Sequence, residues 1–588
     1  MSSTTPLGRP SGAPRADAIA PAGPVADAPA ANPAPRPLVA PLGPVSRGAE
    51  RVDAAHGGSA HVTQLAALRT TALAPGAPAV PTPAPVAPEG PAELRARRLA
   101  DPDVQAALAR VPGMKALRLE ALSPRAIALG ALSATETVRQ LREGSVTAVE
   151  VVQAAIDRAR AGEHLGLVDT PLYARALEQA RALDRAGDFS APFAGVPIVV
   201  KANARLEGVR TSYGSRAMPD APAAETAQNL KDFLALGAIP VLVATTSEFG
   251  FTGVTEPVGQ PPTRNPHDPS RTAGGSSGGS AVAVSAGIVP FAHGTDGGGS
   301  CRIPASLVGV LGMKPSRRRL ALLDFAEKLP VLINTPGVLA RDPSDLATAM
   351  RHLDRGAAAG LPPVGLVEGA PTRPLRIAYY LDPVGGAADP EVRAATLGVV
   401  EQLRAHGHTV EEVPPPYTPG FEKDFLAVYR LIAWAVARSL RKDPRADATQ
   451  LEPFSQGLGA LGLGEVLLAR FWSAGRLKGR HTERSDRVFD THDLLLNPTV
   501  TSVAPKLGAL SPGKRYEDVI DDLKRLVSYT PLQNATGNPA LSLPAARSRD
   551  GLPIGVQLSA PRGADALLLQ LAHQLAAPSA PAPALPAA

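Results

Sequence analysis

The sequence predicts an α/β fold built around a largely buried sheet, and two observations support this. The first is a pair of short apolar runs rich in β-branched residues, at 195–200 (GVPIVV) and 239–244 (IPVLVA). Continuous apolar runs of this length are typical of strands that are covered on both faces. The second is that long helical patterns separate such runs, as in α/β domains. The 588 residues, 44% of them hydrophobic, suffice for one large enzyme domain with insertions or for two to four ordinary domains.

Both ends of the chain differ in composition from its middle. Alanine and proline dominate residues 1–91, which cannot bury enough apolar surface to offset the entropy of ordering them. We therefore predict a disordered N-terminal tail with polyproline character, for which a spacer or docking role is the functional alternative. Residues 578–588 return to alanine and proline and are predicted to form a second disordered tail.

Helical segments precede the first strand. Residues 92–131 are rich in Leu, Ala, Arg and Glu and predict one or two amphipathic helices, separated at Pro124, that form an N-terminal extension packed on the main domain. The main domain is predicted to span 132–577. It opens with a capping box at 133–136 (SATE), and apolar residues at helical spacing through 138–156 predict two helices there.

Two glycine- and serine-rich segments, 274–280 (GGSSGGS) and 297–300 (GGGS), carry most of the functional information. Glycine loses more backbone entropy on folding than any other residue, so such segments predict positive φ angles and backbone N–H groups presented to a ligand. Flexible linkers are the alternative. The small apolar residues 281–284 (AVAV) that follow the first segment favour a buried helix instead, packed closely against other backbone.

Charge and cysteine content exclude several classes of function. The net charge is +6, but the only compact basic run is 317–319, without the interleaved aromatic residues of a nucleic-acid surface. No apolar run reaches the ~18 residues of a membrane helix, and residues 1–10 lack the pattern of a secretory signal. The single cysteine, Cys301, excludes an internal disulfide and a multi-cysteine zinc site. We expect a cytoplasmic protein without metal or cofactor and without a nucleic-acid or membrane partner.

Two common motifs that could explain the glycine-rich segments fit poorly. A phosphate-binding P-loop needs a lysine beside its final glycine, and neither segment has one. The nucleophile elbow GxSxG matches 275–279, with Ser277 at its centre. An elbow must follow a β-strand, however, and 265–271 has the composition of a turn and loop with two prolines. We therefore interpret this match as coincidental.

A third pattern extends along more than half of the chain. It comprises the segments 195–201 (GVPIVVK), 271–280 (RTAGGSSGGS), 294–305 (GTDGGGSCRIPA), 312–315 (GMKP), 495–499 (LLNPT), 536–544 (TGNPALSLP) and 551–557 (GLPIGVQ). Together these segments resemble the amidase signature family almost residue for residue. The resemblance implies a central mixed β-sheet covered by helices on both faces. It also implies a catalytic triad of Lys201, Ser276 and Ser300, with a cis peptide bond between Gly275 and Ser276, acting on a small-molecule amide.

The chemistry of amide hydrolysis is consistent with these three residues. A lysine at the end of an apolar strand is desolvated, so Lys201 can be neutral and act as a base. Ser276 would relay the proton between Lys201 and the nucleophile Ser300, and then deliver it to the departing amine. Backbone N–H groups would bind the oxyanion, and losing one such donor costs ~3 kcal/mol. The predicted donors are those of Gly297, Gly298, Gly299 and Ser300.

Residues beside the predicted triad have supporting interpretations. The family places a supporting role on the position of Ser277. Asp296 and Arg302 flank the nucleophile with opposite charges and are predicted to form an ion pair that fixes the loop. His293 is interpreted as a core or supporting histidine rather than a base, and Cys301 as a packing residue.

Departures from the family pattern refine the prediction. Ala202 follows the lysine where the family usually has an acidic residue, which removes a contact and leaves the level of activity open. Ile303 stands where the glutaminase subunits of tRNA amidotransferases carry glutamine, so an independent hydrolase is favoured over such a subunit. The motifs most resemble the branch that contains the 6-aminohexanoate cyclic dimer hydrolases.

The region 415–490 matches the family least. It carries both tryptophans, Trp434 and Trp472, and is predicted to complete the substrate pocket with apolar side chains, unless these are ordinary core residues. The nature of the amide is left open, as is the oligomeric state, for which a homodimer is one option. A catalytically inactive binding protein that docks through its proline-rich tail is a further hypothesis. The intact set of Lys201, Ser276 and Ser300 argues against it.

Overall fold

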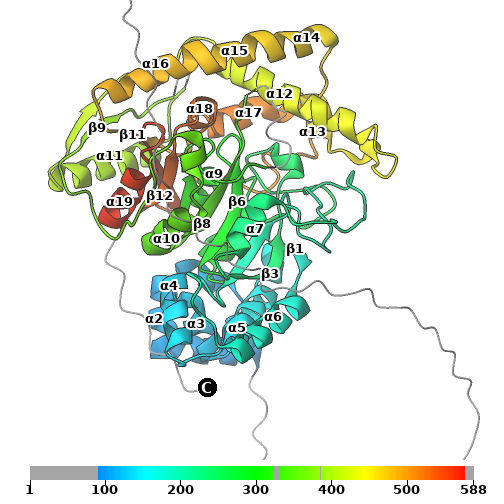
Figure 1. Cartoon of the computed structure of the whole chain (residues 1–588), viewed down its shortest axis with the longest axis vertical. Coiled ribbons are helices and arrows are strands. Elements are labelled where there is room, and N and C mark those ends of the chain that lie inside the picture. Colours follow the sequence, from blue (N-terminus) through cyan, green and yellow to red (C-terminus); the bar gives the residue numbers. More distant parts are fainter. Residues whose placement is uncertain (1–89, 324–330, 384–385, 577–588) are drawn as a thin grey trace, which may run out of the picture. The chain divides into compact units, whose positions relative to one another are not determined.

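The computed structural model describes residues 90–576, apart from 324–330 and 384–385. The predicted C-terminal tail, and all but the last two residues of the predicted N-terminal tail, lie outside the described residues. Within them, eleven strands form one mixed sheet (Figure 1). Its spatial order is β1 (Val168–Pro171), β3 (Ile239–Ala244), β2 (Pro197–Lys201), β6 (Phe291–Asp296), β8 (Thr335–Ala340), β7 (Leu311–Lys314), β12 (Ala540–Arg547), β13 (Pro553–Ser559), β11 (Leu494–Pro498), β9 (Arg376–Tyr379) and β10 (Thr409–Glu412).

The sheet changes from parallel to antiparallel pairing and back. β3, β2 and β6 are parallel, β6 to β11 pair antiparallel through β8, β7, β12 and β13, and β11, β9 and β10 are parallel again. Both strands predicted from β-branched runs are therefore present, as β2 and β3. The mixed character expected from the family resemblance is confirmed.

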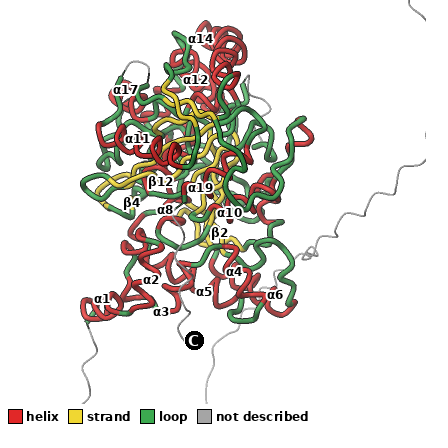
Figure 2. Tube along the Cα trace, turned by 90° about the vertical axis from the view of Figure 1, so that its left-hand side faces the viewer, coloured by secondary structure: helices red, strands yellow, loops and turns green. Residues whose placement is uncertain are grey.

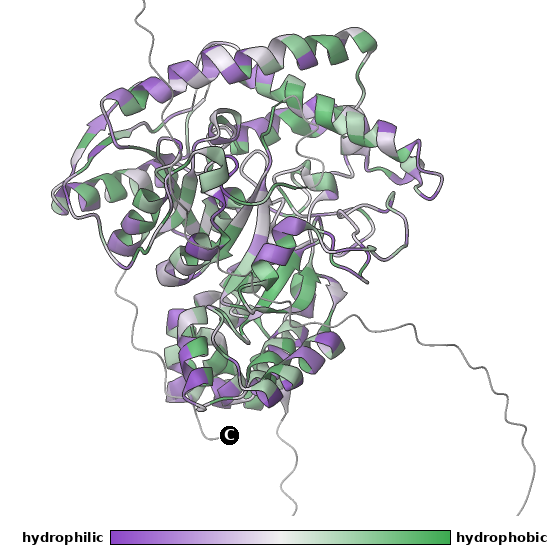
Figure 3. Ribbon diagram, viewed as in Figure 1, coloured by the Kyte–Doolittle hydropathy of each residue, from purple (hydrophilic) through white to green (hydrophobic). Residues whose placement is uncertain are grey.

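Alternating side chains of β2 supply the two apolar cores on the two faces of the sheet. Ile198 and Val200 belong to one cluster of buried residues and Val199 to the other. Helices α7 (Gln228–Leu234), α10 (Pro343–Leu353), α11 (Pro390–Ala405) and α19 (Asp565–Leu575) cover the first face. The second face is covered by α2 (Pro102–Arg110), α3 (Pro124–Ala131), α5 (Ala148–Ala161), α6 (Tyr173–Ala186), α8 (Gly278–Ser285) and α9 (Arg302–Val308). Figure 2 shows the strands gathered between helices, and Figure 3 shows their hydrophobic character.

The N-terminal helical extension contains more elements than predicted. Where one or two helices were expected, the chain forms α1 (Pro91–Ala100), α2 and α3, with two short 3-10 segments between α2 and α3. Prolines at 102, 112 and 124 each begin a segment, because proline has a preset φ and no N–H to satisfy. The predicted capping box opens α4 (Ala134–Arg142): Ser133 Oγ accepts from Glu136 N at 3.0 Å, and Glu136 Oε2 accepts from Ser133 N at 2.8 Å.

A third apolar cluster lies beyond the carboxyl end of β2. It joins Phe251, Val254 and Ile303 to helices α12 (Phe421–Leu440), α13 (Pro453–Leu458), α17 (Tyr516–Leu526) and α18 (Pro531–Thr536). Between α13 and β11 the chain continues through α14 (Leu463–Leu467), α15 (Ala474–Arg476) and α16 (Thr482–Asp486), interrupted by π-helical stretches at Leu468–Ser473 and Leu477–His481. These elements appear in yellow and orange in Figure 1.

One local prediction is wrong. Residues 265–271 were expected to be turn and loop, but they form part of a two-stranded ribbon of β4 (Arg264–Asn265) and β5 (Asp268–Thr272). Pro266 lies in the turn between the two strands, where its missing N–H costs nothing. Arg271, in β5, forms a further antiparallel bridge with Lys506.

None of the described helices is both long enough and apolar enough to cross a membrane.

Candidate active site

Lys201 is the last residue of β2, and its side chain is fully buried. Its Nζ lies 2.8 Å from Ser276 Oγ, 2.8 Å from Ser277 Oγ and 2.9 Å from Thr295 Oγ1. Burial lowers the pKa of Lys201 to about 8, because the ammonium form loses its hydration. Since β2 and β6 are parallel neighbours, their last residues, Lys201 and Asp296, lie at the same edge of the sheet.

The segment 274–277, here called the serine loop, brings two hydroxyls to this lysine. The peptide bond between Gly275 and Ser276 is cis, as the family resemblance implies. Ser277 Oγ donates to the carbonyl of Thr295 at 3.2 Å, and Thr246 Oγ1 donates to the carbonyl of Ser276 at 2.9 Å. Both serines are buried, and Ser277 begins α8 without capping it. Because β5 precedes this loop, the expected lack of a strand no longer argues against the elbow motif. What argues against Ser277 as an elbow nucleophile is its full burial and its bonds to Lys201 and Thr295.

Ser300 lies in the segment 297–300, here called the glycine loop, which connects β6 to α9. It is 7% exposed and, with Gly298, lines a mostly apolar cavity. Its carbonyl accepts from Ser277 N at 3.1 Å, which ties the glycine loop to the serine loop. No hydrogen bond joins Ser300 Oγ to Ser276 Oγ in this structure, although the loops that carry them are in contact.

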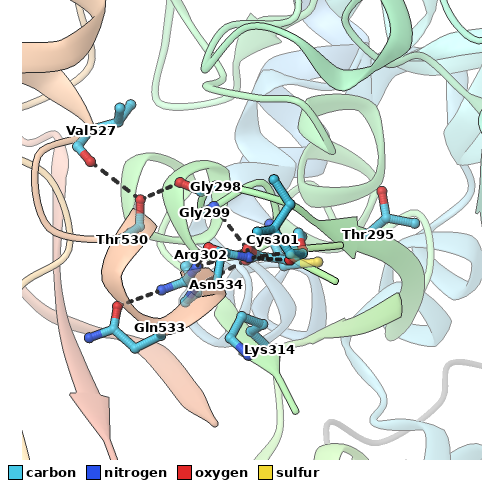
Figure 4. A network of polar contacts seen from close by, with 12 residues as sticks. Thr295, Gly298, Gly299, Cys301, Arg302, Lys314, Val527, Thr530, Gln533 and Asn534 are labelled. Carbon is cyan, nitrogen blue, oxygen red and sulfur yellow. Dashed lines mark hydrogen bonds and ion pairs between the residues drawn. The ribbon is translucent and has the colours of Figure 1, made fainter. Parts of the chain in front are cut away.

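Hydrogen bonds fix the middle of the glycine loop. The carbonyl of Gly298 accepts from Thr530 Oγ1 at 2.6 Å, and the N–H of Gly299 donates to Asp296 Oδ1 at 2.8 Å (Figure 4). The carbonyl of Gly299 accepts from Ile303 N at 2.7 Å. The structure therefore removes Gly299 from the predicted oxyanion donors, because its N–H already serves a carboxylate. The N–H groups of Gly297, Gly298 and Ser300 donate to no other described residue.

The predicted ion pair between Asp296 and Arg302 is confirmed. Both side chains are fully buried, with Nη2 to Oδ1 at 2.8 Å and Nε to Oδ2 at 3.0 Å. Burial acts to raise the pKa of Asp296, but attraction and hydrogen bonds from Arg302, aided by Asn534, hold it well below its usual range. Arg302 also donates to Asn534 Oδ1 at 2.6 Å and to Gln557 Oε1 at 2.6 Å. The pair thus connects the glycine loop to α18 and β13.

Three residues beside the site, His293, Cys301 and Ala202, are buried. His293 is fully buried and its pKa is lowered to about 3, first by desolvation and then by the charge of Lys201. Cys301 is fully buried as a packing residue. Ala202 packs into the apolar cluster on the first face of the sheet, away from the polar contacts of Lys201. Asn203, next along the chain, instead donates to Thr295 Oγ1 at 2.8 Å.

Sequence reasoning missed three polar residues that hold the site. Thr295 accepts from Lys201, Thr530 donates to the glycine loop, and Asn534 Nδ2 donates to Asp296 Oδ1 at 2.9 Å and to its carbonyl at 3.0 Å. Thr295 lay inside a recognised motif, directly before Asp296, which is a signal that could have been used. Thr530 and Asn534 lie between motifs, and nothing in their local sequence points to residues more than two hundred positions away.

The cavity that reaches Ser300 has a volume of about 280 Å³. Its wall is mostly apolar and aromatic, with contributions from Phe251, Ile303, Tyr417, Phe421, Phe425, Leu426, Tyr429, Phe454, Leu458, Ile520, Leu523 and Val527. Glu422 and Lys524, which also line it, form an ion pair at 2.9 Å. Part of the region 415–490, from Tyr417 to Leu458, lines this cavity, whose role as the substrate pocket stays a prediction, and neither tryptophan lines it. Trp472 is 60% exposed, and Arg438 lies over the ring of Trp434.

Among the described residues, no group of three or more His, Cys, Asp and Glu side chains is placed to hold a metal ion.

Comparison with known proteins identifies the family of the chain. The profile of the family described as Amidase matches residues 150–569. The "Putative amidase AmiC" of Mycobacterium tuberculosis H37Rv is 40% identical over 459 residues, which cover 76% of this chain and 94% of the relative. The 6-aminohexanoate-cyclic-dimer hydrolase of Pseudomonas sp. (strain NK87) is 31% identical over 495 residues, covering 75% of this chain and 94% of that enzyme.

A solved structure extends the likeness to three dimensions. The structure of a 6-aminohexanoate cyclic dimer hydrolase superimposes with a TM-score of 0.69 at 29% identity, over 76% of this chain and 96% of that one. The shared sheet and helices, together with the sequence matches, leave one assignment. The chain belongs to the Amidase family and is a hydrolase of carbon–nitrogen bonds.

Proposed function

We propose that the protein hydrolyses amides through a covalent acyl-enzyme on Ser300, with Lys201 as the base and Ser276 as the proton relay. The observation that carries the proposal is the surroundings of Lys201: a buried amine whose nearest partners are three neutral hydroxyls, beside a serine that opens onto an apolar cavity. Such surroundings favour a neutral lysine, which is the form that can accept a proton.

The hydrogens around Lys201 support a direction for the transfer. Because the hydroxyl hydrogen of Ser277 is donated to the carbonyl of Thr295, Ser277 can only accept from Nζ. The hydrogen of Ser276 has no such commitment and can pass to the lone pair of Lys201. Ser276 would then take the proton of Ser300 as Ser300 Oγ attacks the carbonyl carbon. This requires Ser300 Oγ to move within hydrogen-bond distance of Ser276 Oγ when substrate is bound, since catalytic contacts often tighten in the complex.

The remaining steps follow from the same groups. The tetrahedral oxyanion would accept from the N–H groups of Gly297, Gly298 and Ser300. As the carbon–nitrogen bond breaks, the proton held by Lys201 returns through Ser276 to the leaving amine. Water then attacks the ester on Ser300 and gives up a proton through Ser276 to Lys201. As the bond between the acyl carbon and Ser300 Oγ breaks, this proton returns through Ser276 to Ser300 Oγ, and the carboxylic acid leaves with the enzyme restored.

The cavity supports an apolar acyl group in the substrate. Its aromatic and aliphatic wall offers the acyl chain little hydrogen bonding, so binding would come from desolvation of that chain. The 6-aminohexanoate cyclic dimer hydrolases, to which the chain is similar, are named for an amide built from aliphatic chains. We therefore propose a small uncharged amide with an alkyl or aryl acyl part. A cytoplasmic location and the option of a homodimer stay predictions.

The alternatives are less well supported. A glutaminase needs polar contacts for the glutamine side chain, whereas Ile303 lines the cavity beside Ser300 with an aliphatic chain. An inactive binding protein would have no need for a buried lysine at 2.8 Å from two serines.

Labelling with a fluorophosphonate tests the proposal. Intact protein is treated with the reagent and digested, and the modified peptide is identified by mass spectrometry. We expect one phosphonylated serine, Ser300, and loss of amide turnover in proportion to labelling. Ser300→Ala should abolish labelling, while Ser277→Ala, the matched control from the neighbouring loop, should retain it. Labelling at Ser277, or none in an active preparation, would overturn the proposal.

A substrate panel tests the acyl preference. Primary amides and N-alkyl amides with alkyl, aryl, charged and peptide-like acyl parts are compared by kcat/KM. Ammonia release is measured for the primary amides and amine release for the N-alkyl amides. We expect uncharged alkyl and aryl acyl groups to be preferred. A preference for glutamine would instead support the glutaminase alternative.

A further inference from the structure

The glycine loop contains three consecutive glycines, which have no side chains to restrict their backbone. Its conformation must therefore be imposed by contacts from outside. At Gly299 the requirement is visible, since φ is +122° and a Cβ there would lie 2.2 Å from Thr530 Oγ1. The orientation of each peptide unit in this loop decides where its N–H group points.

Two neighbouring peptide units are held in different ways. The unit between Gly298 and Gly299 is fixed at both ends, by Thr530 Oγ1 on its carbonyl at 2.6 Å and by Asp296 on its N–H at 2.8 Å. The next unit is fixed only at its carbonyl, where Ile303 N donates at 2.7 Å, which leaves the N–H of Ser300 free. Holding the first unit thus sets the direction of the free N–H groups on either side, those of Gly298 and Ser300.

Thr530 occupies an unusual position for this contact. It is the N-cap residue of α18, where a threonine hydroxyl ordinarily accepts from the backbone N–H groups of its own helix. No such capping bond is formed, and the fully buried hydroxyl donates to Gly298 instead. Its one other acceptor, the carbonyl of Val527, lies at 3.5 Å, so the single hydroxyl hydrogen belongs to the 2.6 Å bond.

We propose that Thr530 is a positioning residue for the oxyanion donors, acting through the carbonyl of Gly298. The inference rests on the proposed role of Ser300 as nucleophile. Thr530 touches neither the nucleophile nor the oxyanion. It bonds to the carbonyl of Gly298 (Figure 4) and so holds the Gly298–Gly299 peptide unit. In this orientation the N–H groups of Gly298 and Ser300 would face the developing negative charge. Without its hydroxyl the unit is held at one end only and can rotate.

The test compares two substitutions. Thr530→Val keeps the shape and removes the donor, and Thr530→Ser keeps the donor. We expect the valine variant to lose about tenfold in kcat with KM within about twofold, less than the hundredfold or more for a lost direct oxyanion donor. The serine variant should stay within about threefold of the parent, because it restores the hydroxyl. The matched control is Thr501→Val, which removes another buried hydroxyl that donates to a carbonyl, that of Arg525 at 3.0 Å.

Inhibitor binding separates positioning from general structural damage. A trifluoromethyl ketone forms a tetrahedral adduct with an oxyanion, whereas the secondary alcohol of the same length does not. In Thr530→Val the inhibition constant of the ketone should rise by the factor by which kcat/KM falls, while that of the alcohol stays unchanged. If the valine variant does not fold, Thr530→Cys, a similar volume with a weak donor, takes its place.

The possible failures are distinguishable. If the fluorophosphonate does not label Ser300 in the parent enzyme, the proposed function fails. If Ser300 is labelled, three results for Thr530→Val overturn the positioning role alone. These are a kcat equal to that of the parent, an increase in KM without a loss in kcat, and a loss in kcat no larger than that of Thr501→Val. Loss in the serine variant equal to that in the valine variant would also overturn it.

Discussion

At the scale of single residues, the state of Lys201 decides whether the site can act. Its ammonium form would be surrounded by the hydroxyls of Ser276, Ser277 and Thr295, which offer dipoles but no neutralising charge within hydrogen-bond distance. Asp296 attracts the ammonium from farther away, but most of that carboxylate's charge is matched by Arg302. Desolvation therefore dominates, and a lysine becomes usable as a base near neutral pH.

This predicts the pH dependence of the reaction. The pKa of Lys201 is lowered to about 8, and only its neutral form accepts a proton, so kcat/KM should rise about tenfold per pH unit below that pH and level off above it. The measurement is a kcat/KM profile from about pH 6 to about pH 10 on a neutral amide. A midpoint near the ordinary pKa of histidine, about 6.5, would contradict the assignment of Lys201 as the base. His293 does not account for such a midpoint either, since its pKa is lowered to about 3. Lys201→Met should remove the profile altogether.

Replacing Gly298 or Gly299 by alanine should affect activity differently. A Cβ on Gly298 would point into the cavity and meet Phe425 at 3.7 Å, an ordinary contact, whereas one on Gly299 would collide with Thr530. Gly298→Ala should therefore fold normally and lose activity mainly on amides with bulky acyl groups. Gly299→Ala should lose activity on every amide. The comparison needs kcat/KM for a short and a long acyl chain in each variant, and equal losses in both variants would contradict the placement of Gly298 on the cavity wall.

At the scale of elements, the site depends on the junction of β6, α9 and α18. Arg302 at the start of α9 reaches back to Asp296 at the end of β6 and outward to Asn534 in α18. All three side chains are buried, so each polar group needs its partner. The junction locks a helix from the C-terminal part of the chain against the loop that carries Ser300.

Breaking this junction should be costly. Arg302→Met leaves the carboxylate of Asp296 buried without its cation, and we expect a loss of about 3 to 5 kcal/mol in the free energy of unfolding. The control is Arg515→Met, which breaks an exposed pair with Asp518 and should cost less than about 1 kcal/mol. Urea unfolding of both variants measures the difference. Similar losses would show that the buried pair contributes no more than a surface one.

A second element-level prediction concerns Glu452, the N-cap residue of α13. Burial, and then repulsion from the nearby carboxyl of Glu248, raise the pKa of Glu452 to about 8, and its Oε2 has no hydrogen-bond partner among the described residues. The folded chain then holds a proton that the unfolded chain releases near pH 4.5. Stability should be greatest below that pH and decline as pH rises towards 8. Glu452→Gln, neutral at every pH, should flatten the decline between about pH 5 and about pH 8 in urea unfolding. An unchanged slope would contradict it.

What could be predicted from sequence depended on how far apart the interacting residues lie. The strands β2 and β3 were recognisable because each is a self-contained apolar run, and the capping box at 133–136 because it is local. The pair of Asp296 and Arg302 was within reach, being six residues apart. The contact of Thr530 with Gly298 spans 232 residues and leaves no local mark.

Neither tryptophan lines the cavity as expected, and the structure shows why for Trp472. The region 415–490, with both tryptophans, was predicted to complete the pocket on composition alone, but its part 463–490 contributes no residue to the cavity wall. The π-helical stretches change the residue spacing there, and Leu463, Leu467, Phe471 and Trp472 are exposed on the outside. Within 415–490 the cavity wall comes instead from α12, the loop before it and α13, where composition gave no reason to prefer phenylalanine and tyrosine over tryptophan.

At the scale of the whole molecule, the sheet brings together segments from widely separated parts of the chain. The N-terminal helices bury their apolar faces against the same side of the sheet as α8, with Leu108 and Ile127 among the fully or nearly fully buried residues. Every residue of the proposed site lies between Lys201 and Asn534. The helices of 91–131 therefore stabilise the site without contributing a side chain to it.

Truncation should separate these contributions. Removing residues 1–86 should leave kcat/KM and the thermal midpoint unchanged, because every residue of the proposed site and of the apolar clusters lies between residues 90 and 576. Removing residues 1–131 should prevent stable folding, since it uncovers the apolar surface that α2 and α3 bury. Thermal unfolding and activity of both truncated proteins are the measurements. Full activity after the longer deletion would show that the extension is dispensable.

The contact between Thr530, at the start of α18, and Gly298 also has a consequence for the order in which the enzyme is synthesised and folds. Protein synthesis proceeds from the N-terminus, so the glycine loop is made long before Thr530, which lies 232 positions after Gly298. A partly synthesised chain can carry the proposed nucleophile but not the hydroxyl that holds its loop. The strands β12 and β13, which lie inside the sheet, are made later still, so hydrolytic activity would appear only after translation has nearly finished.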